Sequence, residues 1–127
     1  MANVGFIGMG NMGYAILKGL LAHIPKEEMT FFEINKERVL WIEEQTGVLA
    51  AADGNDCAAK SKYLVLAVKP QYMDQVLGDL ASAISREHII ISIAAGIDIQ
   101  YLKEKLGADK RIVRAMPNTP ALVGEGM

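Results

Sequence analysis

The stretch Val4-Gly5-Phe6-Ile7-Gly8-Met9-Gly10-Asn11-Met12-Gly13 decides the fold of this chain. Its apolar start is too short and too uniform for a half-exposed strand, and it predicts a strand buried on both faces of a parallel sheet. A G-x-G-x-x-G turn follows, and small and apolar residues then recur at spacings of three and four up to Leu20. That spacing predicts a helix that ends before Pro25, because a proline disfavours the helical conformation of the residue before it.

Beyond this unit, short apolar runs alternate with longer mixed segments along the whole chain. Such alternation predicts an α/β fold of the Rossmann type, with a doubly wound, mostly parallel sheet and helices on both faces. Further strands are expected at residues 29–34, 63–68, 89–93 and 111–116, with a short additional strand at residues 48–51. Helices are expected at residues 36–46, capped by Asn35 and closed by Gly47, and from the cap Asp98 to residue 106.

Composition limits the chain to one domain and removes two classes of partner. The 127 residues, 51% of them hydrophobic, suffice for one core of ordinary size but not for two. A net charge of -2 and a pI near 5.7 leave no basic surface for nucleic acid or for an anionic membrane. We therefore expect neither nucleic acid nor a membrane as the partner.

The single cysteine and the N-terminal sequence bear on the location of the protein. Cys57 allows no internal disulfide, and the sequence has no thiolate cluster that could hold a structural zinc ion. No basic stretch leads into a signal-peptide core, and no apolar run approaches the roughly 20 residues that span a bilayer. These features predict a soluble, cytoplasmic protein.

The three glycines of the first turn have separate expected roles. Gly8 permits the tight bend, Gly10 lets the backbone approach a pyrophosphate, and Gly13 lets the helix pack closely on the strand. The free N–H groups at the helix start, with the positive end of the helix dipole, then face the phosphates. A glycine turn without a ligand is the alternative, but Glu33 lies twenty positions after Gly13 and completes the dinucleotide-binding fingerprint. The expected cofactor is therefore NADPH or NADH.

Glu33 and its neighbours point to different cofactors. The carboxylate can accept hydrogen bonds from the 2'-OH of the adenosine ribose and would repel a 2'-phosphate, which favours NADH. Asn35, Lys36 and Arg38 lie just beyond it, and an amide or a cation there could hold the 2'-phosphate of NADPH if Glu33 turned outward. The alternative for residues 36–38 is the solvated first turn of a helix. The sequence leaves the choice between the two cofactors open.

Four runs of residues resemble the successive motifs of pyrroline-5-carboxylate reductases, in the order and with the spacing of that family. They are residues 4–13, Ala67-Val68-Lys69-Pro70, Ser92-Ile93-Ala94-Ala95-Gly96 and Arg114-Ala115-Met116-Pro117-Asn118-Thr119-Pro120-Ala121-Leu122-Val123. The last run is the most discriminating, because many dehydrogenases share the glycine turn. The resemblance extends from Val4 to the last residues and points to the N-terminal, cofactor-binding domain of that family.

The resemblance also implies roles for individual residues. The backbone of residues 67–70 is expected against the cofactor, whereas the side chain of Lys69 is equally compatible with an ordinary surface lysine. The small residues 94–96 suit the close approach of a nicotinamide ring or its ribose, although a tight turn is the alternative. Asn118, in a loop stiffened by two prolines, is expected at the junction of cofactor and substrate. Asn55 resembles the family's asparagine near the adenosine ribose, with a helix N-cap as the alternative.

Together the fingerprint and the resemblance give one set of expected cofactor-binding residues. They are Ile7, Gly8, Met9, Gly10, Asn11, Met12, Gly13, Glu33, Asn35, Asn55, Ala67, Val68, Lys69, Pro70, Ala94, Ala95, Gly96 and Asn118. His23 and His88 have no second histidine or carboxylate at ligand spacing, so both are interpreted as structural and no metal site is expected. Trp41 and Cys57 are expected to pack in the core or to be partly buried.

The resemblance implies a reaction in proline biosynthesis. A hydride passes from the reduced nicotinamide to the C=N carbon of 1-pyrroline-5-carboxylate, which yields L-proline. In that family a C-terminal helical domain supplies the substrate contacts and the oligomer-forming helices, so no catalytic residue is named and this chain alone is expected to be inactive. Residues 123–127 carry no helix stop or charged tail, which suggests one domain, residues 1–127, of a longer chain.

Two alternatives to this function remain open. The first is another Rossmann oxidoreductase, such as a β-hydroxyacid dehydrogenase or a deazaflavin-linked NADP reductase. The second is a stand-alone dinucleotide-binding module without chemistry.

Overall fold

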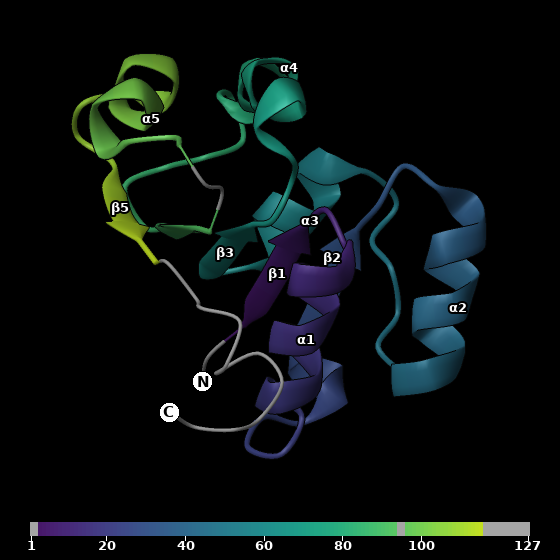
Figure 1. Ribbon diagram of the computed structural model, residues 1–127. Helices are drawn as coiled ribbons and strands as arrows, with labels where there is room; N and C mark the ends of the chain where they lie inside the picture. The colour runs from purple at the N-terminus through teal and green to yellow at the C-terminus, as the bar shows by residue number, and fades with distance from the viewer. Residues whose placement is uncertain (1–2, 94–95, 116–127) are drawn as a thin grey trace, which may run out of the picture.

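The computed structural model describes residues 3–93 and 96–115, and five parallel strands form the centre of this part of the chain (Figure 1). The strands lie side by side in the order β2-β1-β3-β4-β5. Their bounds are β1 Val4–Ile7, β2 Met29–Phe32, β3 Tyr63–Leu66, β4 Ile89–Ser92 and β5 Arg111–Arg114. The chain thus winds outward from β1 in both directions, which confirms the doubly wound Rossmann-type sheet.

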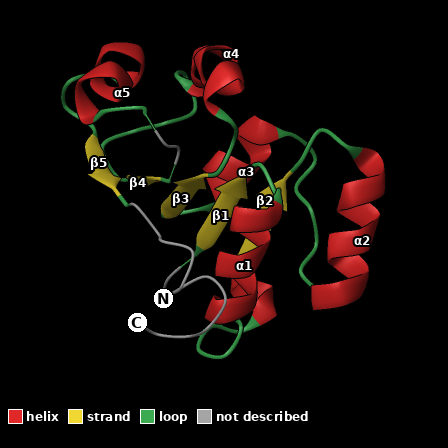
Figure 2. Ribbon diagram, in the orientation of Figure 1, coloured by secondary structure: helices red, strands yellow, loops and turns green. Residues whose placement is uncertain are grey.

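Helices cover both faces of the sheet and make a three-layer molecule (Figure 2). They are α1 Asn11–Leu20, α2 Lys36–Thr46, α3 Gly54–Lys60, α4 Pro70–Leu80 and α5 Ile99–Leu106, with a 3-10 turn at Lys26–Glu28. One core packs α3, α4 and α5 against strand residues such as Leu64 and Ile90. The other packs α1 and α2 against residues such as Phe6 and Phe31. Alternate side chains of β1 to β4 therefore enter different cores, as the parallel-sheet prediction requires, whereas the edge strand β5 is largely exposed.

The strands end earlier than the apolar runs in the sequence do. β1 stops at Ile7 because Gly8 adopts a positive φ of 92°. Ile7 is paired with Phe32 on one side and with Leu66 on the other, so both flanking strands lose their partner at the same level. β2 and β3 therefore end two residues before the predicted positions 34 and 68, and β4 ends at Ser92 in place of residue 93.

The additional strand predicted at residues 48–51 is wrong. Only Ala50 makes an isolated parallel bridge, which it forms with Phe31 at the outer edge of β2. The backbone N–H of Ala50 donates to the Glu43 carboxylate at 3.0 Å. The N–H of Ala51 donates to the carbonyl of Phe31 at 2.8 Å, but no second bridge extends this pairing, and the segment remains a loop.

Local signals at the helix ends are largely confirmed. Asn35 accepts a hydrogen bond from the N–H of Arg38, and Asp98 accepts one from Tyr101, so both predicted caps are present. Gly47 ends α2 with a φ of 77°, as expected of a C-terminal glycine. Helices α3 and α4 occupy segments for which no element is predicted above. Pro70 at the first position of α4 is a usual helix start.

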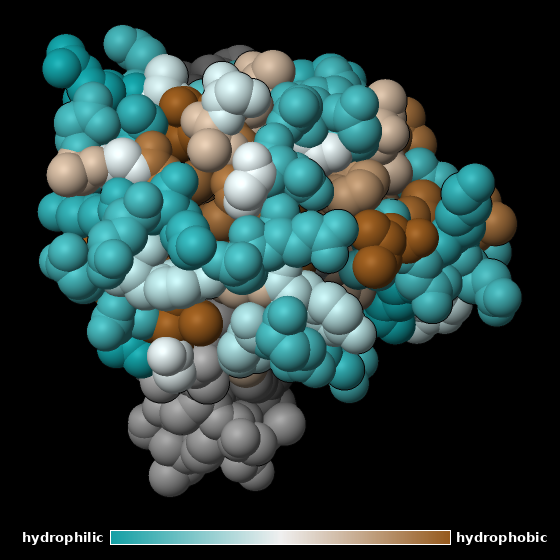
Figure 3. Space-filling view, turned by 90° about the horizontal axis from the view of Figure 1, so that it is seen from above, coloured by the Kyte–Doolittle hydropathy of each residue, from teal (hydrophilic) through white to brown (hydrophobic). Residues whose placement is uncertain are grey.

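Seen from above, on the side where Figure 1 shows α4 and α5, the surface is mostly hydrophilic with separate apolar patches (Figure 3). Within residues 3–93 and 96–115, no helix has the length and apolar character needed to cross a membrane.

Candidate functional site

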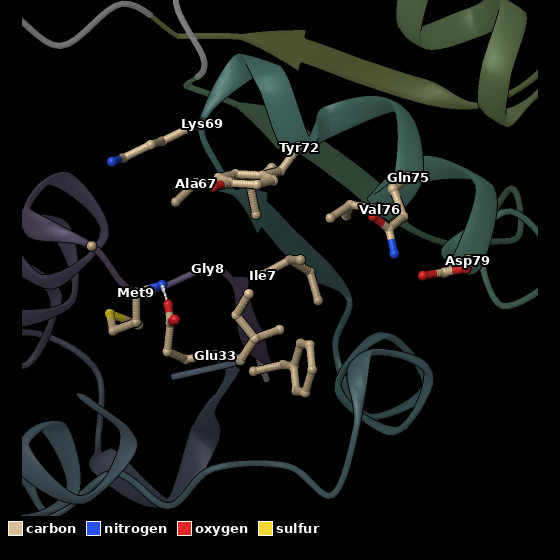
Figure 4. A pocket seen from close by; sticks show the side chains of 14 residues that line it. Ile7, Gly8, Met9, Glu33, Ala67, Lys69, Tyr72, Gln75, Val76 and Asp79 are labelled. Atoms are coloured by element: carbon tan, nitrogen blue, oxygen red, sulfur yellow. Dashed lines mark hydrogen bonds between the residues drawn. The ribbon is translucent and has the colours of Figure 1, made fainter. Parts of the chain in front are cut away.

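A hollow of about 370 Å³ lies at the carboxyl ends of β1 and β3 (Figure 4). These two strands are neighbours at the point where the winding of the sheet reverses, and ligands of open α/β sheets bind at such switch points. The hollow brings together predicted residues from three separate stretches of the sequence. They are Ile7, Gly8, Met9, Gly10, Glu33, Ala67, Val68 and Lys69.

The glycine turn forms one wall of the hollow, and its three glycines differ in their surroundings. At Gly8, with its positive φ, a Cβ atom would lie 2.8 Å from a Val68 methyl group. At Gly13, a Cβ would lie 3.0 Å from the carbonyl oxygen of Gly8, so the helix packs closely there. A Cβ on Gly10 would meet nothing within 4 Å. Gly8 is thus required by its backbone conformation and Gly13 lies in a tight contact, whereas the space at Gly10 is open to a ligand.

The start of α1 lies next to this open space and has no capping side chain. Gly10 is the N-cap residue, and the first turn contains no acidic residue. The first N–H of the turn with a backbone acceptor is that of Tyr14, which donates to the carbonyl of Gly10 at 2.9 Å. Asn11 and Met12 therefore bring N–H groups, together with the positive end of the helix dipole, to the edge of the hollow. This arrangement suits a phosphate group.

Glu33 lies across the hollow from the start of α4 and accepts two backbone hydrogen bonds. Its Oε1 accepts from the N–H of Met9 at 2.7 Å, and its Oε2 accepts from the N–H of Asn35 at 3.0 Å. The carboxylate is half-buried and points into the hollow (Figure 4). Because a carboxylate has about four acceptor positions, capacity remains for a hydroxyl group of a ligand.

The three polar residues after Glu33 are used differently from one another. The Asn35 side chain is occupied as the cap of α2. Arg38 turns toward the glycine turn, where its Nε donates to the carbonyl of Met9 at 2.8 Å. Lys36 is exposed in the first turn of α2. Neither the Asn35 nor the Arg38 side chain is therefore poised for a 2'-phosphate in this conformation, and Lys36 is the remaining candidate of the three.

The end of β3 forms the opposite wall. The N–H of Ala67 donates to the carbonyl of Ile7 at 2.8 Å, which draws this wall toward the glycine turn. Pro70 begins α4, and Lys69 is the exposed residue before it. In Figure 4 the Lys69 side chain extends toward the side of the hollow on which Met9 lies. Residues 67–69 line the hollow and Pro70 is not among its lining residues, so the contact of this run with a cofactor stays a prediction.

Helix α4 supplies lining residues that the sequence analysis missed. Tyr72, Gln75, Val76 and Asp79 form one stripe of the helix that faces the hollow (Figure 4). Their spacing of three and four residues is that of a single helix face, and it is visible in the sequence once a helix is placed there. Phe32 and Ile34, on either side of Glu33, complete the lining on the β2 side.

Asn55 lies at a second hollow that adjoins the first. This space of about 280 Å³ shares four lining residues with the first one. They are Ile7, Phe32, Val76 and Asp79. Asn55 belongs to the first turn of α3, whose cap is Asp53, so the alternative of Asn55 as an N-cap is wrong. The two adjoining hollows are together called the groove below. The position of Asn55 at the far end of this groove is compatible with the expected contact to an adenosine.

The expected nicotinamide end of the site is only partly described. Ala94, Ala95 and Asn118 lie outside the described residues. Gly96 has a φ of 78°, and a Cβ there would meet nothing within 4 Å. This is the conformation that a glycine-dependent turn requires, which was the alternative considered for this segment.

The remaining singled-out residues lie away from the hollow. Burial raises the pKa of the Cys57 thiol to about 12, so this side chain is an inert part of the core. His88 is buried, accepts from the N–H of Ser85 at 3.0 Å and contacts the carbonyl of Ala58 at 2.7 Å, which confirms its structural role. His23 is exposed in the turn after α1. Trp41 is 40% exposed, and the centre of its ring lies 4.8 Å from the centre of the Tyr14 ring, so it is a surface packing residue.

Comparison with known proteins also identifies most of this chain as a cofactor-binding unit. Residues 3–96 match the model of a family described as NADP oxidoreductase, coenzyme F420-dependent. Pyrroline-5-carboxylate reductase of Escherichia coli (strain K12) is 40% identical over 126 residues, which are 98% of this chain and 47% of that protein.

Two solved structures are similar over nearly the whole chain. A pyrroline-5-carboxylate reductase from Coxiella burnetii has a TM-score of 0.91 and 34% identity, covering 96% of this chain and 46% of that one. Plasmodium falciparum pyrroline carboxylate reductase, solved with NADP bound, has a TM-score of 0.83 and 32% identity. The match covers 97% of this chain and 45% of that one. The resemblance inferred from the four sequence runs is thereby confirmed. The chain spans somewhat less than half the length of these relatives.

Proposed function

Because this chain belongs to the family described as NADP oxidoreductase, coenzyme F420-dependent, we propose that it is the dinucleotide-binding domain of a reductase that uses NADH or NADPH. The observation that carries this proposal is the start of α1. Its uncapped N–H groups adjoin an open space at Gly10, and both border the hollow at the switch point of the sheet. A pyrophosphate fits such a site in charge and in hydrogen bonding.

The rest of the groove suits the adenosine half of the cofactor. Glu33 retains acceptor capacity for a ribose hydroxyl, and the apolar surfaces of Phe32, Ile34 and Val76 suit a base. We place the adenosine between the end of β2 and the stripe of α4, with Asn55 at the far end. The nicotinamide is then proposed to extend toward the carboxyl end of β4, which lies beside β3 in the sheet.

We further propose that the complete protein reduces 1-pyrroline-5-carboxylate to L-proline. The bound cofactor supplies the hydride, which adds to the C=N carbon. This chain's own residues hold and orient the dinucleotide, and orientation of two reactants is itself a large part of catalysis. The proposal is supported by 40% identity to a pyrroline-5-carboxylate reductase over nearly the whole chain. The substrate contacts, the catalytic groups and the subunit contacts of a homo-oligomer are proposed to lie in a second, helical domain.

The alternatives predict different reactions for the complete protein. A deazaflavin-linked NADP reductase fits the description of the matching family, and a β-hydroxyacid dehydrogenase shares the cofactor unit. The run Arg114 to Val123 favours the pyrroline-5-carboxylate reductase. The 40% identity between the chain and the Escherichia coli reductase favours it as well. The cytoplasm is the proposed location, since the one cysteine is a buried free thiol.

Titration of this chain with NADH and NADPH tests the cofactor proposal. Arg38 contacts both the ring of Trp41 and the carbonyl of Met9 in the glycine turn. Binding of the cofactor should therefore change the fluorescence of Trp41 or that of the nicotinamide. A saturable change is expected with each cofactor, without proline formation by this chain alone. No saturable change up to millimolar cofactor would contradict the proposal.

A chimera tests the reaction. This chain replaces the matching 126 residues of the Escherichia coli reductase, and proline formation from 1-pyrroline-5-carboxylate and NADPH or NADH is measured. Measurable turnover, lost on Gly10→Val, is the expected result. A folded chimera that binds the cofactor but forms no proline would argue for one of the alternatives.

A further inference from the structure

Three hydrogen bonds connect the glycine turn to the end of β2 and the start of α2. The N–H of Gly8 donates to the carbonyl of Phe32 at 2.8 Å. The N–H of Met9 donates to the carboxylate of Glu33 at 2.7 Å, and the Nε of Arg38 donates to the carbonyl of Met9 at 2.8 Å. Two charged side chains thus hold the two peptide groups that flank Met9, one from each side.

These contacts restrain the part of the turn that leads into α1. The Met9 side chain is fully buried in the core below, so this residue is fixed by its side chain and by both of its peptide groups. The next residue is Gly10, the N-cap of α1. The orientation of the free N–H groups at the helix start therefore depends on where Met9 is held. Hydrogen bonds to charged groups are about twice as strong as neutral ones, so the restraint is substantial.

Arg38 is fixed in this position by aromatic contacts as well. Its guanidinium carbon lies 4.7 Å from the centre of the Trp41 ring and 5.6 Å from that of the Tyr14 ring. Its Nη2 is buried and has no hydrogen-bond partner among the described residues. A buried unpaired donor is unfavourable, so the other contacts must hold the guanidinium inward. In this position Nη2 is covered by protein and is not presented to a 2'-phosphate in the groove.

Glu33 is fixed as firmly as Arg38. Turning its carboxylate outward to admit a 2'-phosphate would break the bonds to both Met9 and Asn35. It would also leave the N–H of Met9, a fully buried residue, without its acceptor. The negative charge therefore stays at the wall of the groove where the ribose is proposed to lie.

We propose that Glu33 and Arg38 form a clamp on Met9 that holds the glycine turn in its phosphate-binding shape and keeps the Glu33 carboxylate facing the ribose. Arg38 is then a positioning residue for both cofactors, because it acts on the glycine turn through Met9. The inference rests on the proposed function only for the identity of the ligand.

Dissociation constants for NADH and NADPH test the role of Arg38. Arg38→Gln removes the guanidinium from Met9, and we expect both constants to rise by about tenfold, with their ratio unchanged. The matched control is Lys36→Gln, which removes the same charge two residues away without touching Met9. It should leave NADH binding unchanged. Loss of NADPH affinity alone in Arg38→Gln would assign Arg38 to the 2'-phosphate and overturn the clamp.

A conservative variant separates geometry from charge. Arg38→Lys keeps the positive charge but cannot place a planar Nε–H donor on Met9 while it stacks on Trp41. We therefore expect it to weaken both cofactors nearly as much as Arg38→Gln does. Affinities equal to those of the parent would show that charge alone suffices, and would overturn the proposal.

Amide hydrogen exchange in the cofactor-free chain tests the clamp without any ligand. The N–H of Met9 should exchange slowly in the parent and at least tenfold faster, by NMR, in Glu33→Ala, whose side chain has no acceptor atom. The N–H of Tyr101, bonded to Asp98, is the internal control and should not change. Equal Met9 exchange in parent and variant would overturn the clamp even if cofactor binding is observed. Failure of cofactor binding with a protected Met9 would contradict the proposed function instead.

Discussion

The start of α1 and the start of α5 differ in their capping: a side chain caps α5, and none caps α1. At α5, the Asp98 carboxylate accepts from the N–H of Tyr101 at 2.8 Å, and the helix start is complete within its own segment. At α1, Gly10 provides no side chain, and the N–H groups of the first turn face an open space. Helices α2 and α3 follow the pattern of α5, with Asn35 and Asp53 as caps.

The difference shows where this fold keeps hydrogen-bonding capacity for a ligand. A capped helix start gains stability, whereas an uncapped one lacks that contribution unless water or a ligand supplies the acceptor. Among the described α-helices, α1 and α4 begin without a capping side chain, and both starts border the hollow at the switch point of the sheet. At α4 the first helical residue is Pro70, which has no N–H group, so α1 offers the larger number of free donors. Changes at α1 should therefore alter binding, and changes at the capped starts should alter stability.

The largest expected effect is that of Gly10→Val. The valine side chain would occupy the space proposed for the pyrophosphate, and we expect the dissociation constants of NADH and NADPH to rise by at least about a hundredfold. The backbone at Gly10 is extended, with φ -77° and ψ -162°, so the thermal midpoint should change by only a few degrees.

The control for this variant is Gly13→Ala, whose Cβ would lie 3.0 Å from the Gly8 carbonyl oxygen. It should lower the thermal midpoint clearly. A Gly10→Val chain that fails to fold would show that Gly10 serves packing.

Gly10→Asp makes the start of α1 resemble that of α5. The new carboxylate can accept from the helix N–H groups and would repel a pyrophosphate, so cofactor binding should be lost as in Gly10→Val. The free energy of unfolding should stay equal or rise by a few tenths of a kcal/mol, because the change adds a cap in place of a glycine. Denaturant unfolding and cofactor titration measure the two effects. If the stabilised variant still binds NADH or NADPH, the free helix start of α1 is not the site that holds the cofactor.

Glu33→Ser should change the choice between the cofactors. Removal of the carboxylate relieves repulsion of a 2'-phosphate, estimated at about 1 to 3 kcal/mol, or roughly tenfold to a hundredfold in relative affinity. The ratio of NADPH to NADH affinity should rise by that factor, and less at high salt, while NADH binding weakens. Dissociation constants at two salt concentrations provide the measurement. An unchanged ratio would mean that Glu33 does not face the ribose.

Asp98→Ala should affect stability alone. It removes the acceptor of the Tyr101 N–H, and loss of such a cap costs about 1 kcal/mol. The dissociation constants of both cofactors should equal those of the parent, since Asp98 does not line the hollow. Weaker cofactor binding by this variant would show that the two helix starts are not independent.

The smallest expected effect concerns Asp56 in the first turn of α3. The N–H of Ala52 at 2.9 Å and the ammonium of Lys60 at 3.1 Å lower the pKa of this carboxyl below 3.8. A lowered pKa in the folded state stabilises the chain above the unfolded pKa, and this contribution disappears as the pH falls through the folded value.

The measurement is the difference in thermal midpoint between the parent and Asp56→Asn. The difference should be small and constant from pH 7 to about pH 5, and should shrink as the pH falls below about 4. A difference that grows toward acid pH would contradict the assigned partners.

Residue patterns that depend on near neighbours allowed much of the fold to be predicted. The strand before the glycine turn, the helix after it, and the caps Asn35 and Asp98 each involve residues a few positions apart. The bounds of the later strands could not be predicted in this way. β2 and β3 end where β1 ends, because Gly8 turns away and removes their hydrogen-bond partner.

The sequence by itself thus determined the parallel sheet, the glycine turn and the acidic residue at the end of β2. Only the tertiary structure decided what these residues contact. Met9 meets Glu33 across 24 positions and Arg38 across 29, and the stripe of α4 faces the groove only because β3 lies beside β1. The physical reason is that periodicity and caps are set within about one helical turn, whereas contacts between distant segments depend on strand order and register.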